Sequence, residues 1–249
     1  MAFPNVRLAN RPLHFIYLCD CSGSMQAQGK IQSLNQAIRS SLPGMAAVAR
    51  ENPEARVLVR AVRFADHAHW HIAEPTPVEQ LQWLDLQAAG ITAMGEALQL
   101  VAAELRTPPM DARALPPVLV LISDGQPTDD FAAGLAALMA QPWARKAVRL
   151  AIAMGHDADL EVLQQFIGRE PGAGVGLRSP LRPLQASNAT TLARYIQWAS
   201  TAVVGAASTP VSRIGGATEL DPVGAPVPLP DLPPTVMDPL DDGEPVVWR

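Results

Sequence analysis

The chain has 249 residues, of which 48% are hydrophobic and 17% charged, and its formal net charge is −5. This length accommodates one sizeable α/β domain with an appendage, and the acidic balance argues against nucleic acid as a partner. There is no apolar run of about 18 residues and no basic segment followed by an apolar core at the start, so we expect a cytoplasmic protein without a membrane span.

Hydrophobic periodicity predicts that strands and helices alternate along residues 14–204. The expected strands are 14–20, 55–64, 67–72, 118–122, 147–154 and 178–186. The expected helices are 30–50, a short helix within 74–87, 95–105, 131–140, 159–167 and 188–204. Only Ala65-Asp66 separates the second strand from the third, which predicts a hairpin at this point.

This alternation predicts an α/β fold with a doubly wound, mostly parallel sheet and one antiparallel edge strand. We expect residues 1–13 to be a lead-in, residues 14–204 the domain, and residues 205–249 a separate tail. The tail contains nine prolines and seven acidic residues against two arginines, and it has no helical or strand period. Such a composition favours a disordered or extended segment that lies on a partner or back on the domain.

One stretch, Asp20-Cys21-Ser22-Gly23-Ser24, combines a carboxylate with two hydroxyls directly after the first apolar strand. Open α/β sheets bind their ligands at the carboxyl ends of the strands, where this stretch is expected to lie. Oxygen ligands of this kind suit Mg²⁺ or Mn²⁺ better than zinc. The sequence therefore predicts a divalent-cation site at the end of the first strand.

An Asp-x-Ser-x-Ser motif after a first strand resembles the metal-ion-dependent adhesion site of von Willebrand factor A (VWA) domains. Two later segments match the same site in order, namely Gly90-Ile91-Thr92 and Ser123-Asp124-Gly125. The resemblance implies a Mg²⁺ or Mn²⁺ ligand set and an open position for a Glu or Asp from a protein partner. That ligand set is Asp20, Ser22, Ser24, Thr92 and Asp124. Ile91 stands where many A domains have glycine or serine, which predicts narrower access to the metal.

The segments 92–98 and 123–130 are also similar to TerY-type bacterial proteins, which are named from tellurium-resistance operons. This resemblance implies a non-enzymatic protein-binding module, a scaffold or regulator that works with a Ser/Thr kinase and a PP2C-type phosphatase in stress or defence signalling. Two alternatives stay open. One is an adaptor for an AAA+ ATPase, as in chelatase-type A-domain proteins. The other is a metal-dependent phosphohydrolase, for which the three loops offer no base or nucleophile beyond the ligands.

Histidines and cysteines offer two further sets of reactive side chains. His67, His69 and His71 alternate along the predicted edge strand and share one face. They fit either a zinc site or a polar edge that discourages the addition of another strand. Cys19 and Cys21 are two residues apart and badly placed for a disulfide, and their loop supplies no basic cradle for a thiolate.

Four other polar or aromatic residues are assigned structural roles. We expect Asp129 and Asp130 to cap the helix that begins at Phe131 rather than to bind the metal. Trp143 and Trp198 are interpreted as packing residues.

The tail contains a short repeat, Thr-x-x-Asp-Pro followed by an aliphatic residue, at residues 218–223 and 235–240. A threonine followed three residues later by an acid resembles the phosphothreonine motifs that FHA domains bind. Phosphorylation of Thr218 and Thr235 would add charge and acceptor oxygens suited to arginine clusters. Chance recurrence of Asp-Pro turns and direct docking without phosphate are the alternatives.

Overall fold

The computed structural model describes residues 10–124, 126–168, 182–208, 230–231 and 247–248. Within them, six strands form one sheet in the order β3-β2-β1-β4-β5-β6. The strands are β1 (Arg11–Asp20), β2 (Ala55–Phe64), β3 (Ala68–Pro77), β4 (Val118–Ser123), β5 (Val148–Met154) and β6 (Leu184–Ala186). Every neighbouring pair is parallel except β2 and β3. The predicted doubly wound sheet with one antiparallel edge strand is therefore confirmed.

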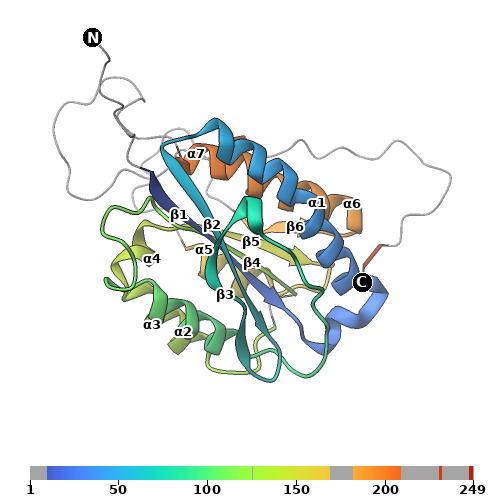
Figure 1. Cartoon of the computed structure of the whole chain (residues 1–249). Helices are drawn as coiled ribbons and strands as arrows, with labels where there is room; N and C mark the ends of the chain where they lie inside the picture. The colour runs from blue at the N-terminus through green and yellow to red at the C-terminus, as the bar shows by residue number, and fades with distance from the viewer. Residues whose placement is uncertain (1–9, 125, 169–181, 209–229, 232–246, 249) are drawn as a thin grey trace, which may run out of the picture.

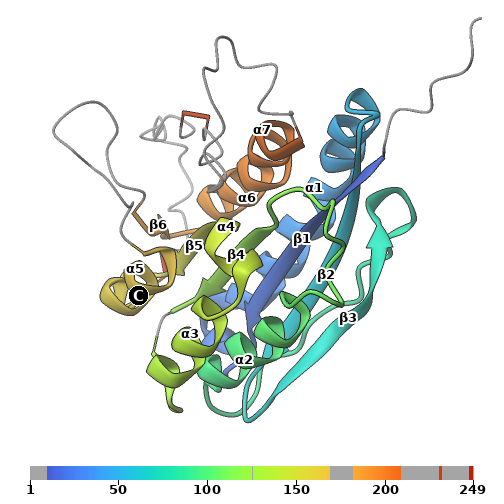
Figure 2. The same cartoon turned by 90° about the vertical axis from the view of Figure 1, so that its left-hand side faces the viewer.

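Helices cover both faces of this sheet (Figure 1). They are η1 (Gly23–Gly29), α1 (Lys30–Glu51), η2 (Val78–Gln80), α2 (Met94–Glu104), α3 (Phe131–Met139), α4 (Pro142–Lys146), α5 (Leu160–Ile167), α6 (Ala189–Trp198), η3 (Ala199–Val203) and α7 (Val204–Ser208). Buried side chains of α1, α6, η3 and α7 pack on one face, and those of α2 to α5 on the other (Figure 2). Two hydrophobic cores result, one on each side of the sheet.

Strand β1 contributes to both cores because its side chains alternate between the two faces. Phe15 and Tyr17 belong to the core under α1 and α6, whereas Ile16 and Leu18 belong to the core under α2 and α3. This strand lies between β2 and β4: the chain continues from β1 to β2 and β3 on one side, and β4, β5 and β6 follow on the other. The carboxyl end of β1, at Asp20, is therefore the topological switch point at which doubly wound sheets bind ligands.

The segment 74–87 contains the predicted short helix, which is the single 3-10 turn η2. Strand β3 continues to Pro77, and only η2 is helical before an extended stretch. Two prolines are tolerated in β3 because it is the edge strand, which leaves one row of backbone groups unpaired. The stretch that follows is held by side chains of α1 instead of by helical hydrogen bonds, as described below.

Element ends also differ from those expected. Strand β1 begins at Arg11, three residues before the predicted start, and the last helical run continues through η3 and α7 to Ser208, past residue 204. Helix α4 has no counterpart among the predicted elements. Part of the expected strand 178–186 and both threonines of the tail repeat, Thr218 and Thr235, lie outside the described residues. Among the helices that the structure describes, none has the length and hydropathy that a membrane crossing needs.

Candidate metal site

Three loops at the carboxyl edge of the sheet carry the predicted ligands, and hydrogen bonds join them. The loop after β1 contacts the threonine loop through the Gly23 amide, which donates to the Gly90 carbonyl over 2.9 Å. Thr92 and Thr128 join the threonine loop to the loop after β4. The Thr92 amide donates to the Thr128 hydroxyl over 3.0 Å, and the Thr128 amide donates to the Thr92 carbonyl over 2.9 Å.

Asp20 is the most buried carboxylate of the set, with 0% of its surface exposed. One oxygen accepts the Ser22 amide over 2.8 Å, and the other accepts the Ser123 hydroxyl over 2.5 Å. Burial raises the pKa of Asp20 to about 6, with a smaller increase from Asp124, while the hydrogen bonds from Ser123 and Ser22 oppose the shift. The two carboxylates thus lie close enough to interact.

Asp124 carries a buried carboxylate oxygen. Its carboxylate is 3% exposed, and its Oδ1 accepts no hydrogen bond from any described residue. A buried polar atom of this kind is costly unless a bound ion satisfies it. The hydroxyls of Ser22 and Ser24 lie 2.9 Å apart, with Ser22 buried and Ser24 exposed. The donor chemistry, two carboxylates and nearby hydroxyls, fits a hard divalent cation.

No group of three or more His, Cys, Asp or Glu side chains in the described part of the chain is placed to hold a metal. The candidate site is consistent with this finding because only two of its five predicted ligands belong to those residue types. The other three are hydroxyls. A site of this composition depends on hydroxyl and water oxygens, which Mg²⁺ commonly accepts as ligands.

The threonine loop owes its shape to Gly90 and Asp66. Gly90 has φ of +79°, a left-handed conformation that favours glycine. A Cβ atom at this position would also collide with the Asp66 carboxylate. That carboxylate accepts the Ile91 amide over 3.0 Å, while the Ile91 side chain is 54% exposed beside Thr92. An apolar side chain therefore borders the candidate site and is open to contact.

Asp129 and Asp130 cap two different helices. Asp130 accepts the Ala133 amide over 2.9 Å at the start of α3, which confirms its predicted role. Asp129 instead accepts the amides of Gly95 and Glu96 over 2.9 and 2.8 Å, so it caps α2. Because α2 follows directly after the threonine loop, this contact fixes that loop against the loop after β4.

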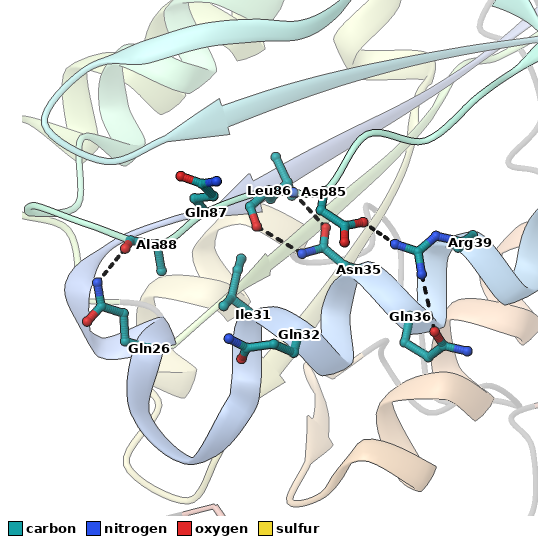
Figure 3. A pocket seen from close by; sticks show the side chains of 10 residues that line it. All are labelled: Gln26, Ile31, Gln32, Asn35, Gln36, Arg39, Asp85, Leu86, Gln87 and Ala88. Atoms are coloured by element: carbon teal, nitrogen blue, oxygen red, sulfur yellow. Dashed lines mark hydrogen bonds and ion pairs between the residues drawn. The ribbon is translucent and has the colours of Figure 1, made fainter.

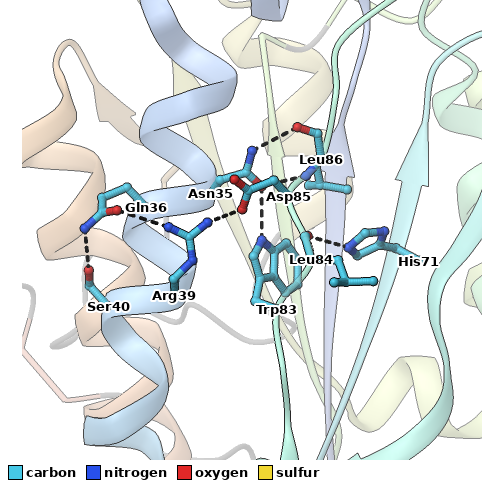
Figure 4. A network of polar contacts seen from close by, with 9 residues as sticks. All are labelled: Asn35, Gln36, Arg39, Ser40, His71, Trp83, Leu84, Asp85 and Leu86. Atoms are coloured by element: carbon cyan, nitrogen blue, oxygen red, sulfur yellow. Dashed lines mark hydrogen bonds and ion pairs between the residues drawn. The ribbon is translucent and has the colours of Figure 1, made fainter.

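Asn35 was not singled out from the sequence, although it holds the segment before the threonine loop. Its amide donates to the Leu86 carbonyl over 2.9 Å, and its oxygen accepts the Leu86 amide over 2.8 Å. The same oxygen accepts the indole N–H of Trp83 over 3.0 Å (Figure 4). The only available signal was a polar residue on the buried face of a predicted helix, four residues after Ile31.

A groove of about 720 Å³ lies between α1 and the segment 85–88 (Figure 3). Polar side chains dominate its lining, among them Gln26, Gln32 and Arg39. Gln26 donates to the Ala88 carbonyl, and Arg39 forms an ion pair with Asp85. Two of its lining residues are near predicted ligands in the sequence, because Gln26 follows Ser24 by two residues and Ala88 precedes Thr92 by four.

His69 and His71 lie on the edge strand β3, and His67 lies in the turn just before it. His67 lies 3.3 Å from the Glu96 carboxylate, while His71 contacts the Leu84 carbonyl over 2.9 Å and packs against Trp83. The rings of His67 and His69 lie edge to face with their centroids 6.4 Å apart, and no group of three or more His, Cys, Asp or Glu side chains among the described residues is placed to hold a metal. The polar contacts of His67 and His71 are compatible with the polar-edge interpretation, and the zinc site stays a prediction.

The cysteines and tryptophans have structural positions. Cys19 and Cys21 are free and fully buried, and burial raises the pKa of Cys21 to about 12. A thiol in this environment stays protonated and is a poor nucleophile. Trp143 and Trp198 are buried, as predicted. Neither thiol supports the phosphohydrolase alternative.

The sheet order and the three joined loops define a doubly wound domain with an oxygen-rich site at the switch point. The family model of the von Willebrand factor type A domain matches residues 16–175, so the chain belongs to this family. No curated protein matches the sequence.

Solved structures share the fold at low sequence identity. A von Willebrand factor type A protein from Catenulispora acidiphila is 17% identical with a TM-score of 0.55, over 79% of this chain and 43% of that one. Proximal thread matrix protein 1 from the mussel byssus is 14% identical with a TM-score of 0.55, over 80% and 49%. The pilus adhesin SpaC from Lactobacillus rhamnosus GG is 13% identical with a TM-score of 0.57, over 78% and 31%. The chain thus spans less than half the length of each of these structures.

Proposed function

We propose that this chain is a metal-dependent protein-binding module without catalytic activity of its own. Its metal is Mg²⁺ or Mn²⁺, and its ligands are Asp20, Ser22, Ser24, Thr92 and Asp124. When bound, the metal supplies an electrophilic position that a Glu or Asp of a partner protein fills. Membership of the VWA family supports a module of this kind.

The observation that carries this proposal is the buried Oδ1 of Asp124, which has no partner among the described residues. It lies beside the buried Asp20 carboxylate, whose pKa is raised by the same surroundings. Two interacting buried carboxylates disfavour the metal-free, ionised site, and a divalent cation removes that cost. The two carboxylates and the nearby hydroxyls would thereby hold an ion and leave one position on it open to a carboxylate of the partner.

For the partner, we propose the TerY-type assignment, with a Ser/Thr kinase, a PP2C-type phosphatase or an FHA-containing protein in a bacterial stress or defence system. The motif similarity at segments 92–98 and 123–130 supports it. The exposed Ile91 side chain beside Thr92 adds an apolar contact to the carboxylate that the metal binds. The partner surface should therefore present an acidic residue with an apolar neighbour.

We expect Asp124→Ala to abolish binding of Mg²⁺ and Mn²⁺ in calorimetry at concentrations that saturate the wild type. The fold should remain, because the strands pair without the ion. Asp130→Asn is the matched control, because it also removes one carboxylate near this edge, while asparagine caps a helix as well as aspartate does. Equal metal affinity in Asp124→Ala and wild type would reject the site.

The same variants test partner binding. A partner captured from the native host in Mg²⁺ should be lost with EDTA and with Thr92→Ala, while Asp130→Asn retains it. A partner that stays bound to Thr92→Ala in EDTA would contradict a metal-mediated contact.

A further expected result concerns Thr218 and Thr235, which we propose as sites for the cognate kinase. Incubation with that kinase should place phosphate on both threonines, as mapped by mass spectrometry, and recruit an FHA domain through the added charge. The double variant Thr218→Ala/Thr235→Ala should lose that recruitment while retaining metal affinity. Phosphate found only at other positions would exclude the repeat as the switch.

A further inference from the structure

Trp248 is a buried tryptophan that the sequence places far beyond the last helix of the domain. Its side chain is 1% exposed and joins the hydrophobic core that includes α1 and α6. The neighbouring Val247 is 45% exposed, so one residue of this short segment points inward and the next outward. A tryptophan buries about 150–250 Å² on packing, which makes it a strong anchor.

The backbone of this segment also forms a hydrogen bond with the domain. The Trp248 amide donates to the Ser187 carbonyl over 2.8 Å, at the residue between β6 and the Asn188 cap of α6. In Figure 1 the segment is the short dark-red stretch near the start of α6. Strand β6 is an edge of the sheet. A backbone hydrogen bond beside an edge strand, together with a pocket for one side chain, is a common way to bind extended peptides.

A second contact lies at the other end of α6. The indole N–H of Trp198 donates to the Asp231 carbonyl over 3.0 Å. Ser187 and Trp198 bracket α6, whose ten residues span about 15 Å. The described stretches 230–231 and 247–248 thus contact opposite ends of one helix. No strand pairing within the sheet involves either stretch.

Backbone hydrogen bonds connect the docking position to the loop that carries Asp124. The Gly155 amide donates to the Ala186 carbonyl over 2.9 Å, one residue before Ser187. The same loop reaches Asp124, whose carbonyl accepts the Asp159 amide over 2.7 Å. A segment bound at Ser187 therefore lies at the edge of the sheet that a metal-bound partner would approach.

We propose that the apolar position beside β6 and α6 that buries Trp248 is an interaction site for an extended segment bearing a tryptophan, and that the chain's own residues 247–248 are its occupant in cis. The site recognises the indole by burial and the backbone through the Ser187 carbonyl. Release of the segment exposes an apolar docking site at the carboxyl edge of the sheet, the same edge that carries the proposed metal ligands. This site is separate from the proposed metal ligands and does not depend on them.

The test uses the full chain with Trp248→Ala and a labelled peptide of residues 244–249, Glu-Pro-Val-Val-Trp-Arg. Fluorescence anisotropy should show binding to Trp248→Ala at least tenfold tighter than to wild type, because an attached segment competes at high effective concentration. Val247→Ala should behave like wild type, and a peptide with alanine in place of tryptophan should not bind. Equal affinity for wild type and Trp248→Ala, or no binding to either, would overturn the proposal.

Two further measurements address two other outcomes. Trp248→Ala could fail to fold, and the segment 247–248 could dock on a second copy of the chain. If circular dichroism shows Trp248→Ala unfolded, Trp248→Phe is used, and it should bind the peptide more tightly than wild type does. A folded Trp248→Phe that matches wild type would make Trp248 a core residue and overturn the proposal. Light scattering should find the wild type monomeric, whereas a dimer that Trp248→Phe dissociates would overturn docking in cis.

Discussion

Asp20→Asn is expected to stabilise the metal-free protein at pH 7 by about 2–3 kcal/mol. The reason is the buried position of this carboxyl, whose pKa is raised from 3.8 to about 6 in the folded protein. At pH 7 the wild type must ionise Asp20 without a cation, whereas asparagine is neutral. Asparagine retains an acceptor for the Ser22 amide and a donor toward the Ser123 hydroxyl, which accepts as well as donates.

The pH dependence follows from the direction of the shift. Between the unfolded pKa of 3.8 and the folded pKa of about 6, the folded wild type binds more protons than the unfolded chain. The contribution of Asp20 to the free energy of unfolding of the wild type therefore decreases as pH rises through this window. The advantage of Asp20→Asn should be absent near pH 4 and complete above pH 6, as measured by urea unfolding in EDTA. An advantage that does not change with pH would contradict the assignment.

Saturating Mg²⁺ should make the wild type more stable than Asp20→Asn, which is the reverse of the order expected in EDTA. Saturating Mg²⁺ should stabilise the wild type at pH 7 and leave Asp20→Asn unchanged, because binding only to the folded state adds to stability. Asp159→Asn is the matched control, since Asp159 is an exposed helix cap and asparagine caps equally well. It should follow the wild type in both buffers. A stabilisation of Asp20→Asn by Mg²⁺ equal to that of the wild type would remove Asp20 from the ligand set.

The sheet and the position of the candidate site were predictable because both depend on local patterns. The run Val118–Ile122 is apolar on both faces, and a strand of this kind must lie inside a parallel sheet. Asp20 ends β1 and Asp124 directly follows β4, and these strands are parallel neighbours, so the topology alone brings the two carboxylates to one edge. The hairpin at Ala65-Asp66 was predictable for the same reason, because it depends on a short connector between two strands. It joins β2 and β3, the antiparallel pair at the edge of the sheet.

Contacts between distant segments were not predictable from the same patterns. Asp129 caps α2 rather than α3, since the partner of a cap depends on which helix start packs nearby. Ser123 belongs to the motif Ser123-Asp124-Gly125, but the motif does not predict its hydrogen bond to Asp20, which joins residues 103 positions apart. The buried position of Trp248 is a further example, because the tail around it has no periodicity. In each case the decisive partner lies far away in the sequence.

Asn35→Ala is expected to destabilise the protein by about 3–5 kcal/mol, because it leaves three polar groups without their partner. These groups are the amide and carbonyl of Leu86 and the indole N–H of Trp83, all bonded to the Asn35 side chain (Figure 4). Asn35, Trp83 and Leu86 are buried, so water does not readily replace the lost contacts. Urea unfolding measures the loss. Gln36→Ala is the matched control, since Gln36 is exposed on the same helix and should cost no more than about 0.5 kcal/mol.

Asn35→Asp separates the hydrogen bonds from the volume of the side chain. The carboxyl still accepts from the Leu86 amide and the Trp83 indole, but only its protonated form donates to the Leu86 carbonyl. Burial disfavours the charged form and raises the folded pKa of such a carboxyl above its unfolded value. The stability of Asn35→Asp should therefore be close to wild type near pH 4 and decrease as pH rises, whereas Asn35→Ala should lose the same amount throughout. A parallel pH profile for the two variants would mean that packing at Asn35, and not its three hydrogen bonds, holds the segment before the threonine loop in place.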